Sequence, residues 1–209
     1  MPHRPSRTCG QWGLSPPRDA SATHTPGSGR IDTANRGREN DGMNIDHLLR
    51  TFGDGGVEYL LIGGMNFLLR HEPVLTYDID FWIRDAAANL DRCDKALRKL
   101  DAAWGPTEQD WRPVAAQPGW LDRQEVFCLT SFSGAIDIFR TVKGLPSWAE
   151  CNSRAYVGQT AGGVPYRGLC DEDMLACQLA LPPADRRRNR VEALERALGR
   201  RGRQDDTPA

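Results

Sequence analysis

The 209-residue sequence lacks several features that would assign it to a common class of protein. Its six cysteines form no Cys-X-X-Cys pair and no Cys/His cluster with the spacing of a zinc site. No hydrophobic run approaches the roughly 20 residues that a membrane-spanning helix needs, so we expect no membrane partner. The formal net charge of -1 gives no general reason to expect nucleic-acid binding. We therefore expect a reduced, cytoplasmic protein in which any basic binding site is local.

Residues 1–42 have few aliphatic side chains and are rich in Pro, Gly, Ser, Thr and Arg. Such a segment cannot bury enough apolar surface to offset its ordering entropy, so we expect it to be disordered. Its Pro and Gly content would break the amphipathic helix of a transit peptide. We favour Met43 over Met1 as the true start of the protein. The sequence thus predicts one domain over 43–200 and a disordered tail over 201–209.

From Met43 onwards, helical and strand patterns mix without strict alternation. Turn signals between 130 and 135 and between 159 and 164 predict two antiparallel hairpins. The region 104–124, rich in Trp, Pro and Gly, is predicted to be a loop. The fold class that we expect is α+β, with a mixed β-sheet, flanking helices and a C-terminal helical segment. Helices are predicted at 46–52, 65–71, 86–100, 146–154, 171–181 and 184–200, and strands at 57–62, 75–83, 125–130, 135–141, 155–159 and 164–167.

The segment from Tyr59 to Arg84 carries most of the functional information. Asp78 and Asp80 lie on a predicted strand and are separated by one apolar residue. Because side chains alternate across a strand, both carboxylates project from the same face. Each raises the pKa of the other unless a cation lies between them, and Mg²⁺ prefers such oxygen ligands. A solvated strand face is the simpler explanation, and it suits either residue alone better than both.

Asp137 lies between two isoleucines in another predicted strand. An aspartate in the centre of an apolar strand is unusual unless something binds it. If this strand neighbours that of the other two aspartates, three carboxylates converge, which is enough to hold two metal ions roughly 3.5–4 Å apart. An ion pair with Arg84 or Arg140 is the alternative explanation for this acid.

Gly63 and Gly64 end an apolar strand and open a short helix. Backbone N–H groups at such a turn, together with the helix N-terminus, can meet a triphosphate. Without Cβ atoms, the glycines let a phosphate approach; a tight turn with no ligand is the alternative. Arg70 and Arg140 are candidates for holding triphosphate oxygens, although arginines more often lie on the surface or in ion pairs.

These residues together resemble the signature of the DNA polymerase β-like nucleotidyltransferase superfamily. The signature is an apolar residue, two small residues, a spacer, and two acids around one apolar residue, which here is Ile62-Gly63-Gly64, then Met65 to Tyr77, then Asp78-Ile79-Asp80. The third acid of the superfamily, on a later strand, matches Asp137. Within the superfamily, residues 43–198 are most similar to small bacterial proteins of the abortive-infection toxin type. Those proteins carry an Arg and a Thr at places comparable to Arg70 and Thr76.

The resemblance implies Mg²⁺-dependent transfer of a nucleoside monophosphate from an NTP to an RNA, protein or small-molecule acceptor. Asp78 and Asp80 would bind two Mg²⁺ ions, Asp137 would bind the catalytic one, and Gly63 and Gly64 would hold the β- and γ-phosphates. Arg70, Thr76 and Arg140 would complete the nucleotide site. The toxin resemblance adds tRNA or a protein as acceptor and a cognate antitoxin as partner.

Four residues depart from the pattern of these relatives. Gln178 and the pair Arg188-Asn189 stand where a Lys and a Lys-Asp pair are usual, and Asn66 replaces a small apolar residue. These changes favour an alternative function, a catalytically weak binding module that acts as a nucleotide sensor or antitoxin-like partner. The basic residues between 186 and 201 are consistent both with a solvated helix face and with a patch for an RNA backbone.

Overall fold

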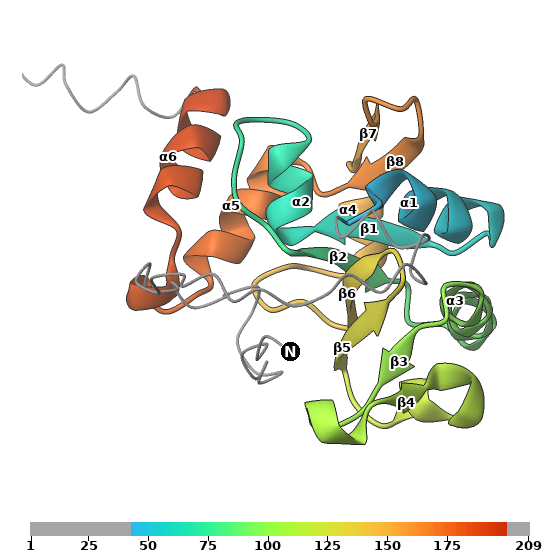
Figure 1. Ribbon diagram of the computed structural model, residues 1–209. Coiled ribbons are helices and arrows are strands. Elements are labelled where there is room, and N and C mark those ends of the chain that lie inside the picture. Colours follow the sequence, from blue (N-terminus) through green and yellow to red (C-terminus); the bar gives the residue numbers. More distant parts are fainter. Residues whose placement is uncertain (1–42, 200–209) are drawn as a thin grey trace, which may run out of the picture.

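The computed structural model describes residues 43–199, with the exception of the side chain at position 108 (Figure 1). The predictions of a disordered segment over 1–42, a start at Met43 and a tail over 201–209 concern residues outside this range. None of the helices within the range is long and apolar enough to cross a membrane. The helices are α1 (Ile45–Asp54), α2 (Gly63–Leu68), α3 (Ala87–Lys99), α4 (Trp148–Ser153), α5 (Asp171–Leu179) and α6 (Arg188–Ala197).

The strands form one mixed sheet in the order β4-β3-β5-β6-β2-β1-β8-β7. At its centre, β2 runs antiparallel to β1 and parallel to β6. This arrangement confirms the α+β class with a mixed sheet, flanking helices and a C-terminal helical segment. The strands are β1 (Tyr59–Ile62), β2 (Asp78–Ile83), β3 (Ala103–Trp104), β4 (Arg112–Pro113), β5 (Val126–Ser131), β6 (Gly134–Phe139), β7 (Tyr156–Gln159) and β8 (Pro165–Gly168).

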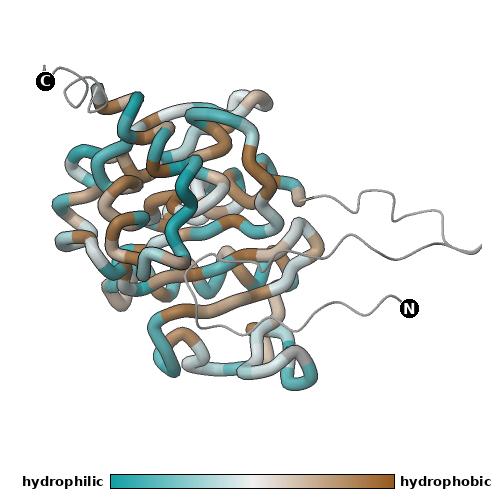
Figure 2. Tube along the Cα trace, turned by 90° about the vertical axis from the view of Figure 1, so that its left-hand side faces the viewer, coloured by the Kyte–Doolittle hydropathy of each residue, from teal (hydrophilic) through white to brown (hydrophobic). Residues whose placement is uncertain are grey.

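Two hydrophobic clusters cover the two faces of the sheet. One contains Ile79, Phe81 and Ile83 of β2 and packs against α1 and α3. The other contains Trp82 of β2 and Phe139 of β6 and packs against α2, α4, α5 and α6. Figure 2 shows hydrophobic stretches of the chain within the body of the molecule and hydrophilic stretches at many of its outer turns. Because side chains alternate along a strand, the even-numbered positions of β2 all face the helices of the second cluster.

Several predicted elements differ from those observed. The region 104–124 contains β4 and 3-10 turns, and Trp104 and Trp120 lie buried with ring centroids 5.9 Å apart. These tryptophans pack, as expected for side chains under a long connection. The final helix begins at Arg188 rather than 184, because Pro183–Asp185 forms a separate 3-10 turn. Helix α3 begins at Ala87 without a side-chain cap, and the carboxylate of the preceding Asp85 pairs with Arg140 at 2.8 Å.

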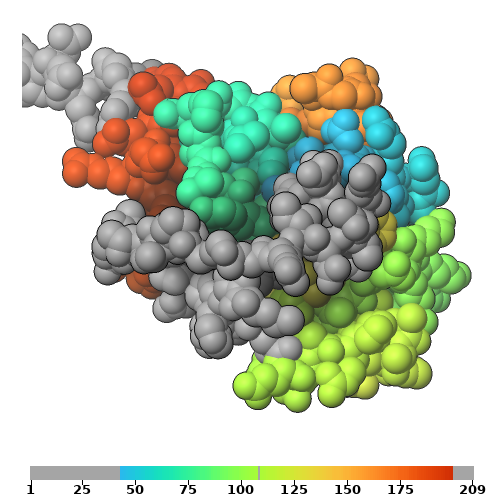
Figure 3. Space-filling model, in the orientation of Figure 1, coloured from blue at the N-terminus to red at the C-terminus, as the bar shows by residue number. Residues whose placement is uncertain are grey.

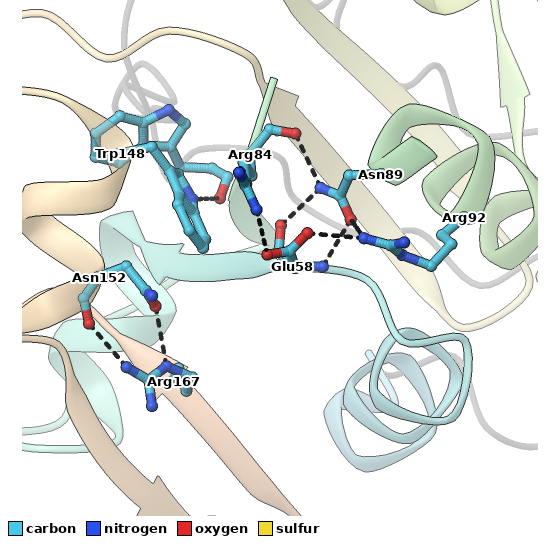
Figure 4. Close-up of polar contacts among 8 residues, drawn as sticks. Glu58, Arg84, Asn89, Arg92, Trp148, Asn152 and Arg167 are labelled. Carbon is cyan, nitrogen blue, oxygen red and sulfur yellow. Dashed lines mark hydrogen bonds and ion pairs between the residues drawn. The ribbon is translucent and has the colours of Figure 1, made fainter. Parts of the chain in front are cut away.

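A polar cluster joins β1 and β2 to α3 at the ends of these strands opposite the glycine turn (Figure 4). The fully buried Asn89 amide donates to the carbonyls of Glu58 and Arg84, each at 2.9 Å, and accepts from the Glu58 N–H at 2.8 Å. The Glu58 carboxylate pairs with Arg84 at 2.9 Å and with Arg92 at 2.7 Å. One side chain thus satisfies three backbone groups where the strands end.

Replacing Asn89 by Ala should destabilise the protein by about 2–4 kcal/mol, because three hydrogen bonds of a buried amide would be lost and the Glu58 N–H would lose its partner. Urea unfolding followed by circular dichroism measures this change. Lys95→Ala, an exposed position on the same helix, is the matched control and should change the free energy of unfolding by less than about 0.5 kcal/mol. Equal effects of the two substitutions would show that the Asn89 hydrogen bonds contribute little.

Candidate active site

The structure brings the three predicted aspartates to one face of the sheet. Asp80 of β2 lies directly opposite Asp137 of β6 in the parallel register, and Asp78 precedes Asp80 by two residues on the same strand. Asp80 and Asp137 are buried, with 2% and 8% of their surface exposed, whereas Asp78 is half-buried. Asp78 and Asp80 are an even number of residues from Trp82 on β2, and Asp137 is two residues from Phe139 on β6. Because side chains alternate along a strand, all three aspartates lie on the face covered by α2, α5 and α6.

Arg84 and Arg140, the two arginines considered as partners of Asp137, are committed to other residues. Arg84 pairs with Glu58, and Arg140 pairs with Asp85. Both lie where β2 and β6 end, beyond the aspartates in the direction of these strands. The structure therefore gives no support to an ion pair with either arginine as the reason for an aspartate at position 137.

The pKa of Asp80 is raised well above its usual value. Burial is the largest cause, followed by the negative charges of Asp78 and Asp137; a hydrogen bond from the Gly64 backbone and the positive charge of Arg190 act in the opposite direction. Within residues 43–199, the buried Oδ2 of Asp80 has no hydrogen-bond partner. A buried carboxylate oxygen in this state is expected to be costly unless a cation or a proton satisfies it.

The residues fit an oxygen-ligated divalent cation by their chemistry. Three carboxylates share one face, two of them in register, and one of their oxygens is buried without a partner. Hard cations such as Mg²⁺ take ligands of this kind. However, no group of three His, Cys, Asp or Glu side chains in the described part of the chain is already arranged as a metal site.

Gly63 makes room for an aspartate. Its φ of +66° lies in the left-handed region, and a Cβ at this position would be 1.9 Å from Oδ2 of Asp80. The sequence suggested that this glycine lets a phosphate approach, but the atom next to it is the carboxylate oxygen of the site itself. Glycine is needed here both for the backbone conformation and for the close approach of Asp80.

Gly64 is surrounded by side chains from two other parts of the chain. A Cβ on Gly64 would meet Oγ1 of Thr76 at 2.7 Å and Nη2 of Arg190 at 3.2 Å. The Thr76 hydroxyl donates to Oδ1 of Asp78 at 3.2 Å, so it links the glycine turn to the aspartates. Thr76 thus lies in the site, as a partner of an aspartate. Its predicted contact with a nucleotide stays a prediction.

Arg70 and Arg140, the two arginines proposed for phosphate binding, are engaged elsewhere. Arg70 pairs with Asp171 at 2.6 Å, donates to the Leu169 carbonyl at 2.6 Å and stacks over the ring of Tyr156. These contacts tie the end of α2 to the start of α5 and to β7. Arg140 holds Asp85 and the Leu121 carbonyl. The structure therefore gives neither arginine a contact with the aspartates or the glycine turn.

Arg190 is the residue of this site that sequence reasoning missed. The basic run containing it was recognised, but its members were not distinguished. The periodicity of α6 carries the distinguishing signal, because Arg190 lies three and four positions before the buried Ala193 and Leu194. It therefore shares the face that α6 presents to the core, and its guanidinium lies over the ring of Phe67 in α2 at 5.8 Å.

Gln178 and Asn66, two of the residues that depart from the pattern of the relatives, form hydrogen bonds within the protein. Oε1 of Gln178 in α5 accepts a hydrogen bond from the Arg187 N–H at 3.0 Å and so holds the start of α6. The fully buried Asn66 donates to the Leu169 carbonyl at 3.1 Å and joins α2 to the segment after β8. Both residues connect elements that surround the aspartates, which gives each a role independent of any ligand.

No protein-family model matches the sequence, and no curated protein matches it. Among solved structures, a crystal structure of ANT(2")-Ia in complex with adenylyl-2"-tobramycin is similar at a TM-score of 0.49 and 14% identity, over 75% of this chain and 88% of that one. JHP933 from Helicobacter pylori is similar at a TM-score of 0.34 and 13% identity, over 68% of this chain and 56% of that one. At these scores, the likenesses carry no information about substrate or activity.

Proposed function

We propose that the protein is a Mg²⁺-dependent nucleotidyltransferase. The observation that supports this most is the register of Asp80 and Asp137 on neighbouring parallel strands, with Asp78 on the same face and the Gly63–Gly64 turn against Asp80. In the reaction, an acceptor oxygen forms a bond to the α-phosphorus of an NTP. The bond from that phosphorus to the β-phosphate oxygen breaks, and pyrophosphate leaves.

The proposed roles of the chain's own residues are those that the resemblance implies for their positions. Asp78 and Asp80 would hold the two Mg²⁺ ions, and Asp137 would hold the catalytic ion and accept the proton of the attacking hydroxyl. When bound, Mg²⁺ supplies the positive charge that stabilises the triphosphate and the departing pyrophosphate. Thr76 orients Asp78 through its hydrogen bond, and the Gly64 N–H orients Asp80. Catalysis by such a site is mostly positioning and charge neutralisation.

The acceptor is an RNA, a protein or a small molecule, and a role as a bacterial cytoplasmic toxin with a cognate antitoxin belongs to this proposal. For an RNA such as tRNA, the basic residues of α6 would supply backbone contacts. Part of this charge is already engaged within the chain. Arg186 donates to the Leu179 and Leu181 carbonyls, and Arg188 pairs with Glu192 at 3.3 Å.

A second candidate function is a nucleotide-binding module that transfers nothing. It is favoured by the departures at Gln178 and Asn189 from the pattern of the nucleotidyltransferase relatives. The buried carboxylates count against it. Keeping Asp80 and Asp137 side by side costs stability, and a protein without metal chemistry would gain by losing one of them.

A labelling experiment separates the two candidates. The full chain is incubated with Mg²⁺, each labelled NTP, and bulk tRNA, cell lysate or a panel of small hydroxylated acceptors. We expect transfer of label that EDTA abolishes, that Asp137→Asn lowers at least about 1000-fold, and that Asp91→Asn, an exposed position on α3, leaves unchanged. Tight NTP binding with no transfer to any acceptor would favour the binding module, and equal labelling by Asp137→Asn would remove the proposed mechanism.

A further inference from the structure

The guanidinium of Arg190 lies at the centre of the candidate site. Its Nη2 is 3.2 Å from the position that a Cβ on Gly64 would occupy. Its charge acts on both Asp78 and Asp80. Figure 3 shows that the surface of α6 adjoins that of the α2 region on one face of the molecule. A cation from the last helix thus lies beside the glycine turn, between two elements that are far apart in the sequence.

The hydrogen-bond donors of this guanidinium are not used by the rest of the described chain. Arg190 is half-buried and packs over Phe67, yet within residues 43–199 it donates no hydrogen bond and forms no ion pair. The neighbouring arginines Arg186 and Arg196 both donate to acceptors in the chain. A guanidinium carries five N–H donors in a planar fork, and this fork matches the oxygens of a phosphate.

A second positive charge lies close to the first. The pKa of Arg190 is lowered by its burial and then by the charge of Arg187, while Asp80 and Asp78 act in the opposite direction. The fold therefore holds two like charges near each other on neighbouring turns of the chain around the start of α6. A polyanion bound there would relieve this repulsion and supply oxygen acceptors to the unused donors.

We propose that Arg190 binds a phosphate of the nucleotide at the glycine turn, so that α6 supplies the phosphate-binding arginine of the site. This inference rests on the proposed function and deepens it, since Arg70 and Arg140 are committed elsewhere. It also gives the C-terminal helix a direct part in substrate binding. Gln178 fixes the beginning of that helix through Arg187 N–H, and so places Arg190 one turn further along.

Binding of inorganic tripolyphosphate in the presence of Mg²⁺ tests the inference without a need for activity. Isothermal titration calorimetry on the full chain compares the wild type with Arg190→Gln, Arg190→Lys and Lys95→Gln. Lys95 is the control, because it is an exposed basic residue on α3, which packs on the other face of the sheet. We expect Arg190→Gln to weaken binding about 10–100-fold, Arg190→Lys to weaken it less, and Lys95→Gln to change it less than about twofold.

The possible outcomes separate this inference from the proposed function. Thermal unfolding with a single transition near that of the wild type shows that a variant is folded, and Arg190→Lys provides a second test should Arg190→Gln fail this check. Wild-type binding that both Arg190 variants retain in full would overturn the role of Arg190 and leave the nucleotidyltransferase proposal intact. A wild type that binds neither tripolyphosphate nor any NTP would overturn both.

Discussion

Asp80→Asn is expected to abolish nucleotidyl transfer and to raise the thermal stability of the same protein. Transfer should fall at least about 1000-fold, because the carboxylate that we propose as a ligand of the metal ions is lost. Stability should rise because a buried charge beside Asp78 and Asp137 is replaced by a neutral group of the same shape. The amide oxygen of the new side chain can still accept from the Gly64 N–H. We expect this gain to appear as an increase in Tm of a few degrees.

The pH dependence of this gain identifies its cause. The pKa of Asp80 is raised in the folded state, so the folded protein binds a proton there more tightly than the unfolded chain does. The wild type therefore loses stability as pH rises from the unfolded pKa of about 4 through the higher folded pKa. Asp80→Asn does not lose stability in this way. The stability difference between the variant and the wild type should therefore be small below about pH 4 and reach a plateau above the folded pKa of Asp80.

Divalent metal provides the control for the Asp80 experiment. Mg²⁺ binds the folded protein and not the unfolded chain in the proposed mechanism, so it should raise the Tm of the wild type. The Tm of Asp80→Asn should respond much less. An unchanged or lower Tm for Asp80→Asn in metal-free buffer would show that the aspartate cluster is not held under electrostatic strain.

Gly63→Ala should damage both the fold and the site, with a loss of about 3–5 kcal/mol in the free energy of unfolding. A φ of +66° is unfavourable for alanine, and the new Cβ would lie 1.9 Å from Oδ2 of Asp80. Either the turn or the aspartate must move. Urea unfolding measures the loss, and the labelling assay should show that any folded fraction transfers label far more slowly than the wild type.

Gly53→Ala is the matched control and should have the opposite sign. Gly53 is an exposed glycine within α1, and a Cβ there meets nothing within 4 Å. Alanine favours a helix over glycine by roughly 0.5–1 kcal/mol, so this variant should be slightly more stable and fully active. A similar loss in both variants would mean that the close approach of Asp80 to the turn is not what requires glycine at position 63.

The positions of the aspartates could be predicted from the sequence because they depend on local rules. Alternation along a strand places Asp78 and Asp80 on one face, and the apolar neighbours of Asp137 indicate a central strand. The hairpin of β5 and β6 was predictable for the same reason. The parallel pairing of β2 with β6, which places Asp80 beside Asp137, depends on contacts between distant segments. From the sequence alone, the convergence of the three carboxylates could therefore be stated only on the condition that these strands are neighbours.

The partners of charged side chains could not be predicted from the sequence. Arg70, Arg140 and Arg190 are all arginines near candidate residues, and composition does not distinguish them. Arg70 lies within reach of Asp171 and Arg140 within reach of Asp85, whereas Arg190 reaches the glycine turn without an acceptor. Ion pairs depend on distances between segments, which periodicity does not contain.

By itself, the sequence of this protein determined which face of each strand carries a carboxylate, where the chain turns after β1, and the mixed character of the fold. These features follow from the alternation of side chains and the conformational range of glycine, both of which act over a few residues. The tertiary structure alone decided that Gly63 accommodates Asp80 and that Arg190, rather than Arg70 or Arg140, lies beside Gly64. Those outcomes depend on how α2, α6 and the sheet pack, because only packing brings charges from distant segments within a few ångströms of each other.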